Sequence, residues 1–182
     1  MGQYYKVLAQ VGNSRKSIST YLDGEYQMAK LMEQSWLGNY YVDTIASMFY
    51  KKKGRVAWVG DYADDSPYYS QVWNEEKNLV SDESLKKVDF SLDNKFLCNH
   101  DSKIYVDLEE YKKASAFGEN KDWIIHPLPL LTAQGNGRGG GDYYDNYPNF
   151  DKVGDWAMEL ISIEDEIPEG YERFDIFFKE GA

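Results

Sequence analysis

The chain has 182 residues, of which 42% are hydrophobic and 16% are aromatic. This is enough apolar material for one folded domain and too much for a disordered chain. Its 31 acidic and 20 basic residues give a formal net charge of −11. Because a field of that sign repels phosphate backbones, the charge excludes unaided nucleic-acid binding and predicts attraction to basic protein surfaces. Acidity that serves only solubility is the plainer alternative.

The cysteine content and the first residues indicate the compartment. Cys98 is the only cysteine, so an internal disulfide is excluded and we expect a reducing, cytoplasmic environment. No apolar run is long enough to span a bilayer, and the opening MGQYYKVLAQ has neither a basic leader nor an apolar signal core. Lys6 stands where N-myristoylation requires Ser or Thr. We therefore expect no export and no membrane partner.

The first predicted elements are strands at residues 4–11 and 17–22. The turn-forming sequence Gly-Asn-Ser at 12–14 separates them, which predicts a hairpin. An Asp-Gly pair at 23–24 is among the strongest short hairpin signals. It predicts a second turn that leads into a strand at 26–32, so the chain is expected to begin as a meander.

The clearest helical pattern follows Asn39, a suitable N-cap residue. Apolar residues recur there at helical spacing, namely Val42, Ile45, Ala46 and Phe49. Asp43 lies in the first turn and three lysines at 51–53 follow the last turn, as the helix dipole favours. Gly54 is expected to end this helix. The lysine run is therefore interpreted as a helix end and not as a nucleic-acid patch.

The later elements are mainly strands. An apolar strand at 56–59 leads into an acidic turn at 60–65. In chain order there follow a short helix at 81–87, a hairpin of strands at 95–99 and 103–107, a weak helix at 109–117, and strands at 123–125, 156–163 and 171–178. No strand-helix-strand alternation runs through the chain. The pattern predicts a single α+β domain over residues 1–182, with a mainly antiparallel β-sheet and a few short helices.

The least ordinary stretch is the glycine-rich segment at 135–141, with five glycines in seven residues. Glycine lets the backbone approach a ligand closely, so N–H groups here are suited to form an anion cradle. Arg138 lies inside the segment as a charged partner, and Asp142 follows it directly. No strand-GxGxxG-helix context is present, so this is not a nucleotide-binding fingerprint. A long loop without chemistry is the alternative.

His126 is the candidate general base near this segment, because it titrates near neutral pH and precedes Pro127 and the glycines. A structural role for this histidine is the commoner case.

Asp61 and Asp64 lie in the acidic turn, where carboxylate oxygens suit a divalent cation, although the spacing is not that of an EF-hand. Solvated carboxylates are the alternative there. Glu33 lies just before the capped helix, and its pKa would be raised if it were buried.

Five runs of the sequence resemble a family of small proteins from phages, prophages and mobile elements, mostly of low-GC Gram-positive bacteria. The runs are MGQYYK at 1–6, KLMEQSWLGN at 30–39, VAWVGDYAD at 56–64, HPLPLLTAQGNGRGGGDY at 126–143 and DWAMELISIEDEIPEGY at 155–171. Together they reach from end to end of the chain. One member of the family is a type II-A anti-CRISPR protein that provokes truncation of the single guide RNA.

The resemblance implies a cytoplasmic inhibitor in a bacterial host cell that binds the type II-A effector nuclease with its guide RNA and causes truncation of that RNA. It points to the motif residues Glu33, Asp61, Asp64, His126, Arg138 and Asp142. We assign His126 or Glu33 as the base that deprotonates a ribose 2′-OH and Arg138 as the cation that steadies the phosphorane. Gln34 stands where relatives carry His, which weakens proton transfer at that position.

Two alternatives to this effector-dependent ribonuclease stay open. One is an acidic inhibitor that only binds, as a decoy for nucleic acid in the basic channel of the same nuclease. The other is a phage protein that binds a metal or a small ligand and has no connection with CRISPR. No cofactor is indicated, beyond the possible divalent cation at the acidic turn.

Overall fold

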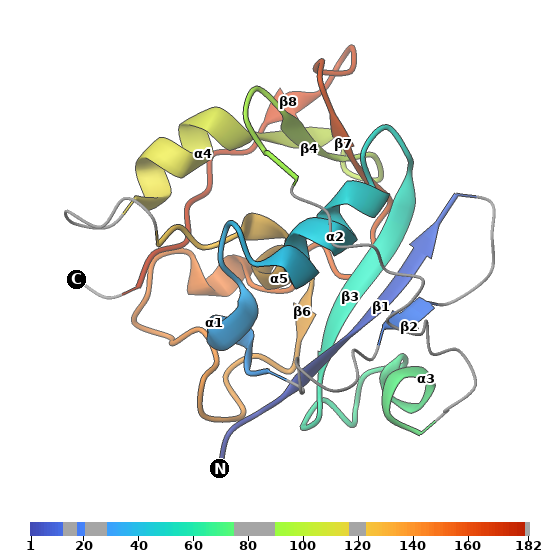
Figure 1. Ribbon diagram of the computed structural model, residues 1–182, viewed down its shortest axis with the longest axis vertical. Coiled ribbons are helices and arrows are strands. Elements are labelled where there is room, and N and C mark those ends of the chain that lie inside the picture. Colours follow the sequence, from blue (N-terminus) through green and yellow to red (C-terminus); the bar gives the residue numbers. More distant parts are fainter. Residues whose placement is uncertain (13–17, 21–28, 75–89, 117–122, 181–182) are drawn as a thin grey trace.

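The computed structural model describes residues 1–12, 18–20, 29–74, 90–116 and 123–180. In these residues the chain forms one sheet of eight strands, mostly antiparallel, with five short α-helices packed around it (Figure 1). The predicted α+β class, with a mainly antiparallel sheet and few short helices in a single domain, is confirmed. No helix of the described ranges is long and apolar enough to cross a membrane.

The strands follow the spatial order β2-β1-β3-β7-β4-β5-β8, and β6 pairs with β3 off this path. Their bounds are β1 Tyr5–Val11, β2 Ile18–Thr20, β3 Gly54–Gly60, β4 Phe96–Asn99, β5 Ile104–Asp107, β6 Ala133–Gln134, β7 Ile161–Glu164 and β8 Glu172–Arg173. The β3–β6 and β5–β8 pairs are parallel. Because β3 and β7 share only the pair Gly54 with Ile161, the sheet consists of two antiparallel halves that meet at one point.

The helices are short, and side chains cap three of them. Their bounds are α1 Leu31–Gln34, α2 Tyr40–Met48, α3 Tyr69–Trp73, α4 Leu108–Ser115 and α5 Pro127–Leu131, with a 3₁₀ turn η3 at Phe150–Lys152. Asn39 accepts from two backbone N–H groups at the start of α2, Asp107 does so for α4, and His126 accepts one at the start of α5. These caps satisfy N–H groups that have no partner within the helix.

The β1–β3 pair is buried on both faces, which explains why its sequence is apolar without a strict alternation. Tyr5, Val7 and Ala9 point into the large core, which includes side chains of α2 and α5. Leu8 points the other way, into a smaller cluster closed by Val72 of α3. Figure 1 shows α2 and α5 to the left of β3, and α3 beside the lower end of the β1–β3 pair.

Several predicted elements are confirmed with small shifts of their ends. The first strand is β1, the helix capped by Asn39 is α2, and the predicted hairpin is the β4–β5 pair. The predicted helix at 109–117 is α4. The pairing of the first two strands is also confirmed, because Leu8 of β1 lies opposite Ser19 of β2.

Other predictions are wrong, each for a local reason. Leu31 and Met32, expected in a strand, open α1. Gly54 does not end α2; the helix ends at Met48, Lys51 adopts a φ of 55°, and Gly54 starts β3. The strand predicted at 156–163 begins only at Ile161, because turns that include Gly154 (φ 89°) and Met158 (φ 60°) precede it.

Two further strands are shorter than predicted. Of residues 123–125, only Ile125 makes a β-bridge, to Trp36. In 171–178, only Glu172–Arg173 find a neighbouring strand, and the backbone beyond them has no ladder partner. The predicted helix at 81–87 and the turn at 23–24 lie outside the described residues.

Candidate functional site

The glycine-rich loop, residues 135–141, is where four of the five motif runs meet. The N–H of Gln3 donates to the carbonyl of Gly140 at 3.1 Å, and the N–H of Gly140 donates back to the carbonyl of Met1 at 3.0 Å. The N–H of Met32 in α1 donates to the carbonyl of Gly141 at 3.0 Å. The loop is therefore held by the N-terminal segment and by α1, at the lower end of β3.

The backbone N–H groups of the loop do form an anion cradle, but the anion in it is Asp142 of the chain itself. One carboxylate oxygen of Asp142 accepts from the N–H groups of Gly137 at 2.7 Å, Arg138 at 2.9 Å and Gly139 at 3.1 Å. The other oxygen accepts from the hydroxyl of Tyr5 at 3.0 Å. Burial raises the pKa of the Asp142 carboxyl, against the opposing effect of these hydrogen bonds. Asp142 thus acts as a structural centre for the loop.

The glycines make room for Gln3, whose side chain is completely buried. A Cβ built at Gly139 would lie 2.5 Å from the Cβ of Gln3, and one at Gly135 would lie 2.7 Å from its Nε2. Gly60, at the end of β3, is closer still to the same amide. These distances leave no space for a side chain at any of the three positions. Two of the five loop glycines, Gly135 and Gly139, are therefore required by close packing around Gln3.

Arg138 is paired within the chain. Its guanidinium makes a bidentate contact to Asp65, with N–O distances of 2.7 and 2.8 Å, and it also donates to the carbonyl of Tyr62 at 2.9 Å. The Arg138 side chain is 41% exposed. The hydrogen bonds that Arg138 donates to Asp65 raise the pKa of Arg138 and lower the pKa of Asp65. The predicted phosphate partner is therefore engaged by a carboxylate of the acidic turn.

His126 is buried and uncharged. Its Nδ1 accepts from the N–H of Leu128 at 3.1 Å, which places the ring proton on Nε2, and that nitrogen has no hydrogen-bond partner. Burial lowers the pKa of His126 to about 3. Its backbone N–H donates to the carbonyl of Ser35 at 2.8 Å, which fixes it behind α1. The ring is an N-cap for α5 and is shielded from an RNA in solvent.

Glu33 is half-exposed and belongs to a capping box. Its carboxylate accepts from the backbone N–H of Lys30 at 3.1 Å and pairs with the ammonium of Lys30 at 3.0 Å. Partial burial acts to raise the pKa of Glu33, but the hydrogen bonds from Lys30 outweigh it and the pKa is lowered. Glu33, His126 and Arg138 are all described residues, and no hydrogen bond or ion pair joins any two of them.

The two predicted metal ligands lie on the same turn but serve different neighbours. Asp61 accepts from the N–H of Tyr4 at 3.0 Å, which ties the turn to β1. Asp64 is 83% exposed and lies 3.9 Å from Arg138. Within the described ranges, no group of three or more His, Cys, Asp or Glu side chains is arranged to hold a metal ion.

A second polar cluster, around His100, had no signal in the sequence. Nδ1 of His100 lies 2.6 Å from the hydroxyl of Tyr171, and its Nε2 lies 2.7 Å from the hydroxyl of Ser162, which donates to Glu164 at 2.6 Å. Burial, followed by the nearby Lys53, lowers the pKa of His100. Because Ser162 is fully buried, this chain of hydrogen bonds ties β7 to the β4–β5 turn and does not present a nucleophile.

The sequence also did not identify the two side chains that complete the glycine-rich loop, Gln3 and Tyr5. The run MGQYYK that contains both was distinctive, but nothing in it indicated contact with residues more than 130 positions away.

When the chain is compared with protein-family models, with curated proteins and with solved structures, none of them matches.

Proposed function

We propose that this protein inhibits a type II-A CRISPR effector nuclease by binding the RNA-loaded effector through its own acidic surface. The observation that carries the proposal is an excess of exposed carboxylates that form no ion pair with lysine or arginine side chains of the described residues. The acidic segment, residues 164–180, holds seven acidic and two basic residues. Glu166, Glu169 and Glu172 in it are exposed and form no ion pair with any described residue.

A carboxylate surface of this kind fits a basic partner. Effector nucleases hold the guide–target duplex in a positively charged channel, and complementary fields speed association and fix its register. The basic side chains of the present chain offset only part of this surplus. Lys51 is paired with Asp165 and Arg173 with Asp175, whereas the three exposed glutamates of the acidic segment have no ion pair with a described residue. The resemblance of the five motif runs to a family with a type II-A anti-CRISPR member supports this choice of partner.

Of the two inhibitory modes, the geometry supports binding over cleavage of the guide RNA. Cleavage needs a base and a cation that face one phosphate. His126 is buried beneath α1, Glu33 is held by Lys30, and Arg138 is held by Asp65. The candidate base His126 is therefore shielded from RNA, and Glu33 and Arg138 are paired with different neighbours and not with each other.

The proposal is tested by titrating the protein against a guide-loaded type II-A effector and measuring three quantities: DNA cleavage, affinity at several salt concentrations, and guide length on a denaturing gel. We expect stoichiometric inhibition, a steep loss of affinity as salt rises, and an intact guide. Combined Glu166→Gln, Glu169→Gln and Glu172→Gln should weaken binding about tenfold, from about half a kcal/mol for each exposed charge.

Glu33→Gln is the matched control, because glutamine preserves the capping box while it removes both a charge and the predicted base. This variant should inhibit as the wild type does, and so should Arg138→Gln. Shortening of the guide that depends on both the effector and Glu33 would replace binding with cleavage as the mode. No binding to the effector at low salt would overturn the proposal altogether.

A further inference from the structure

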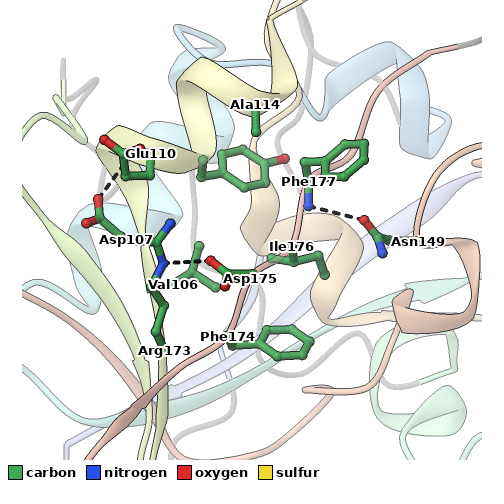
Figure 2. A pocket seen from close by; sticks show the side chains of 11 residues that line it. Val106, Asp107, Glu110, Ala114, Asn149, Arg173, Phe174, Asp175, Ile176 and Phe177 are labelled. Atoms are coloured by element: carbon green, nitrogen blue, oxygen red, sulfur yellow. Dashed lines mark hydrogen bonds and ion pairs between the residues drawn. The ribbon is translucent and has the colours of Figure 1, made fainter.

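A surface pocket lies between α4 and the backbone that follows β8. It has a volume of about 160 Å³ and is lined by Asp107, Glu110, Arg173, Phe174, Asp175 and Phe177, among others. Figure 2 shows Asp107 and Glu110 on one side of the pocket and Phe177 on the other. A cavity of about 150 Å³ holds a benzene molecule. The pocket is therefore large enough for one planar side-chain head group.

The charges that line the pocket favour a cation. Three carboxylates, of Asp107, Glu110 and Asp175, face one guanidinium, that of Arg173. Nε of Arg173 is already paired with Asp175 at 2.6 Å. Asp107 caps α4 and Glu110 is paired with Lys113 in an exposed ion pair, so the lining still holds three carboxylates against one guanidinium, and its net charge attracts a cation.

The other lining groups suit a planar cation in particular. Phe177 offers an aromatic ring and is 38% exposed, whereas the ring of Phe174 packs against Trp156. Guanidinium groups stack on such rings and bind carboxylates through a fixed fork of N–H donors, which an ammonium group lacks. The ion pair of Glu110 with Lys113, at 2.7 Å, is exposed, so its carboxylate is readily shared with an incoming donor.

We infer that this pocket receives an arginine side chain of the protein partner. The inference rests on the proposed function only for the identity of that partner, a basic nuclease. The pocket is continuous in sequence with the acidic segment, since Arg173, Asp175 and Phe177 belong to both. The acidic segment would attract the partner at long range, and the pocket would fix one of its arginines.

The first test uses the protein alone. N-acetyl-arginine amide is titrated into ¹⁵N-labelled protein, and the amide signals of Ala114 and Phe177, two lining residues, are followed. We expect saturable shifts with millimolar affinity. N-acetyl-citrulline amide has the same shape without the charge and should leave these signals unchanged, as should inorganic phosphate. Equal shifts with citrulline, shifts with phosphate, or no saturable shifts with arginine would each overturn the inference.

Two neighbouring variants provide the matched comparison. Glu110 lines the pocket and Glu109 does not, and each forms an ion pair with the lysine three positions later in α4, the pair of Glu109 being the less exposed. Glu110→Gln should weaken arginine binding about twofold to fivefold, while Glu109→Gln should leave it unchanged. Equal effects of the two would show general attraction instead of a site.

The same pair is then tested for inhibition of the effector nuclease, which separates the two proposals. Weaker inhibition by Glu110→Gln than by Glu109→Gln supports the arginine pocket as part of the nuclease interface. If the wild type binds arginine but not the nuclease, the proposed function is wrong and the pocket remains an arginine-binding site for another partner. If both variants inhibit as the wild type does, the pocket does not receive an arginine of that nuclease.

Discussion

The glycine-rich loop and the α4 pocket differ in how completely the chain satisfies its own polar groups. In the loop, Asp142 receives four hydrogen bonds and Arg138 is paired with Asp65. In the pocket, the carboxylates of Glu110 and Asp175 are engaged only in exposed ion pairs, with Lys113 and Arg173. The loop has the more distinctive sequence, yet its distinctive residues bind one another. A functional surface has to leave groups for a ligand, and in this respect the pocket and the acidic segment are the better candidates.

This difference predicts where substitutions act. Asp142 is buried and hydrogen-bonded to the loop, so its loss should lower the free energy of unfolding. The pocket carboxylates of Glu110 and Asp175 are exposed and cap no helix, so their loss should change binding and leave folding nearly unaffected. Three experiments on the loop side test the comparison, from the largest expected effect to the smallest.

Asp142→Ala should destabilise the protein most. It removes the acceptor of three backbone N–H groups and of the Tyr5 hydroxyl. Buried donors that lose their partner cost about 1 to 3 kcal/mol each, reduced where water enters, so we expect a total loss of about 3 to 5 kcal/mol. Urea unfolding followed by tryptophan fluorescence measures it.

Asp145→Ala is the control for this change. Asp145 is exposed and has no partner among the described residues, so its replacement should alter the free energy of unfolding by less than about 0.5 kcal/mol. Similar stability of the two variants would mean that Asp142 does not hold the loop together, and the contrast with the pocket would be lost.

The pH dependence of stability should be dominated below neutrality by His126, at the start of the same motif run. Burial lowers its pKa to about 3, against about 6.5 in the unfolded chain. The unfolded state therefore takes up a proton first as the pH falls. Its contribution to stability is fully present above about pH 6.5 and is lost towards pH 3, at about 1.4 kcal/mol per pH unit.

Between pH 6.5 and pH 5 this amounts to about 2 kcal/mol. His126→Asn keeps an N-cap acceptor and does not titrate, so its urea unfolding should show a pH slope smaller by this amount. His100→Gln removes the other histidine and should retain most of the wild-type slope. An unchanged slope in His126→Asn would indicate that the ring is accessible and protonated in the folded state.

The fold was largely predictable because its signals are local. Asn39 followed by apolar residues at helical spacing predicted α2, and the turn at 100–102 predicted the β4–β5 hairpin. The errors arose where tertiary contacts override local preference. The apolar run at Leu31 did not predict a helix, and α1 is tied by the hydrogen bond from Met32 to Gly141 to a loop more than a hundred residues away.

The candidate site was predictable only in part. Backbone N–H groups of the glycine-rich loop form a cradle, as expected, but the sequence does not show which anion fills it. An aspartate directly after the glycines was a usable signal, because Asp side chains commonly accept from nearby backbone N–H groups. His126 before Pro127 likewise fits an N-cap followed by proline at the first helical position, which predicts α5 better than a general base.

The packing of the loop around Gln3 gives the finest test, because two adjacent glycines differ in it. A Cβ at Gly139 would lie 2.5 Å from the Cβ of Gln3 and 2.8 Å from its backbone nitrogen, so Gly139→Ala forces a backbone shift. We expect a loss of about 1 to 2 kcal/mol. The nearest atom to a Cβ at Gly140 is 3.5 Å away, an ordinary contact.

Neither glycine has a positive φ, so backbone strain does not enter the comparison. Gly140→Ala should therefore leave stability unchanged or raise it by up to about 1 kcal/mol, since alanine restricts the unfolded chain. Both variants are measured by urea unfolding. If Gly139→Ala lowers the free energy of unfolding while Gly140→Ala raises it or leaves it unchanged, glycine is required at 139 by contact with Gln3. Equal losses would instead point to a requirement for flexibility along the whole loop, which is the property of a ligand-binding loop and would reverse the ranking of the two regions.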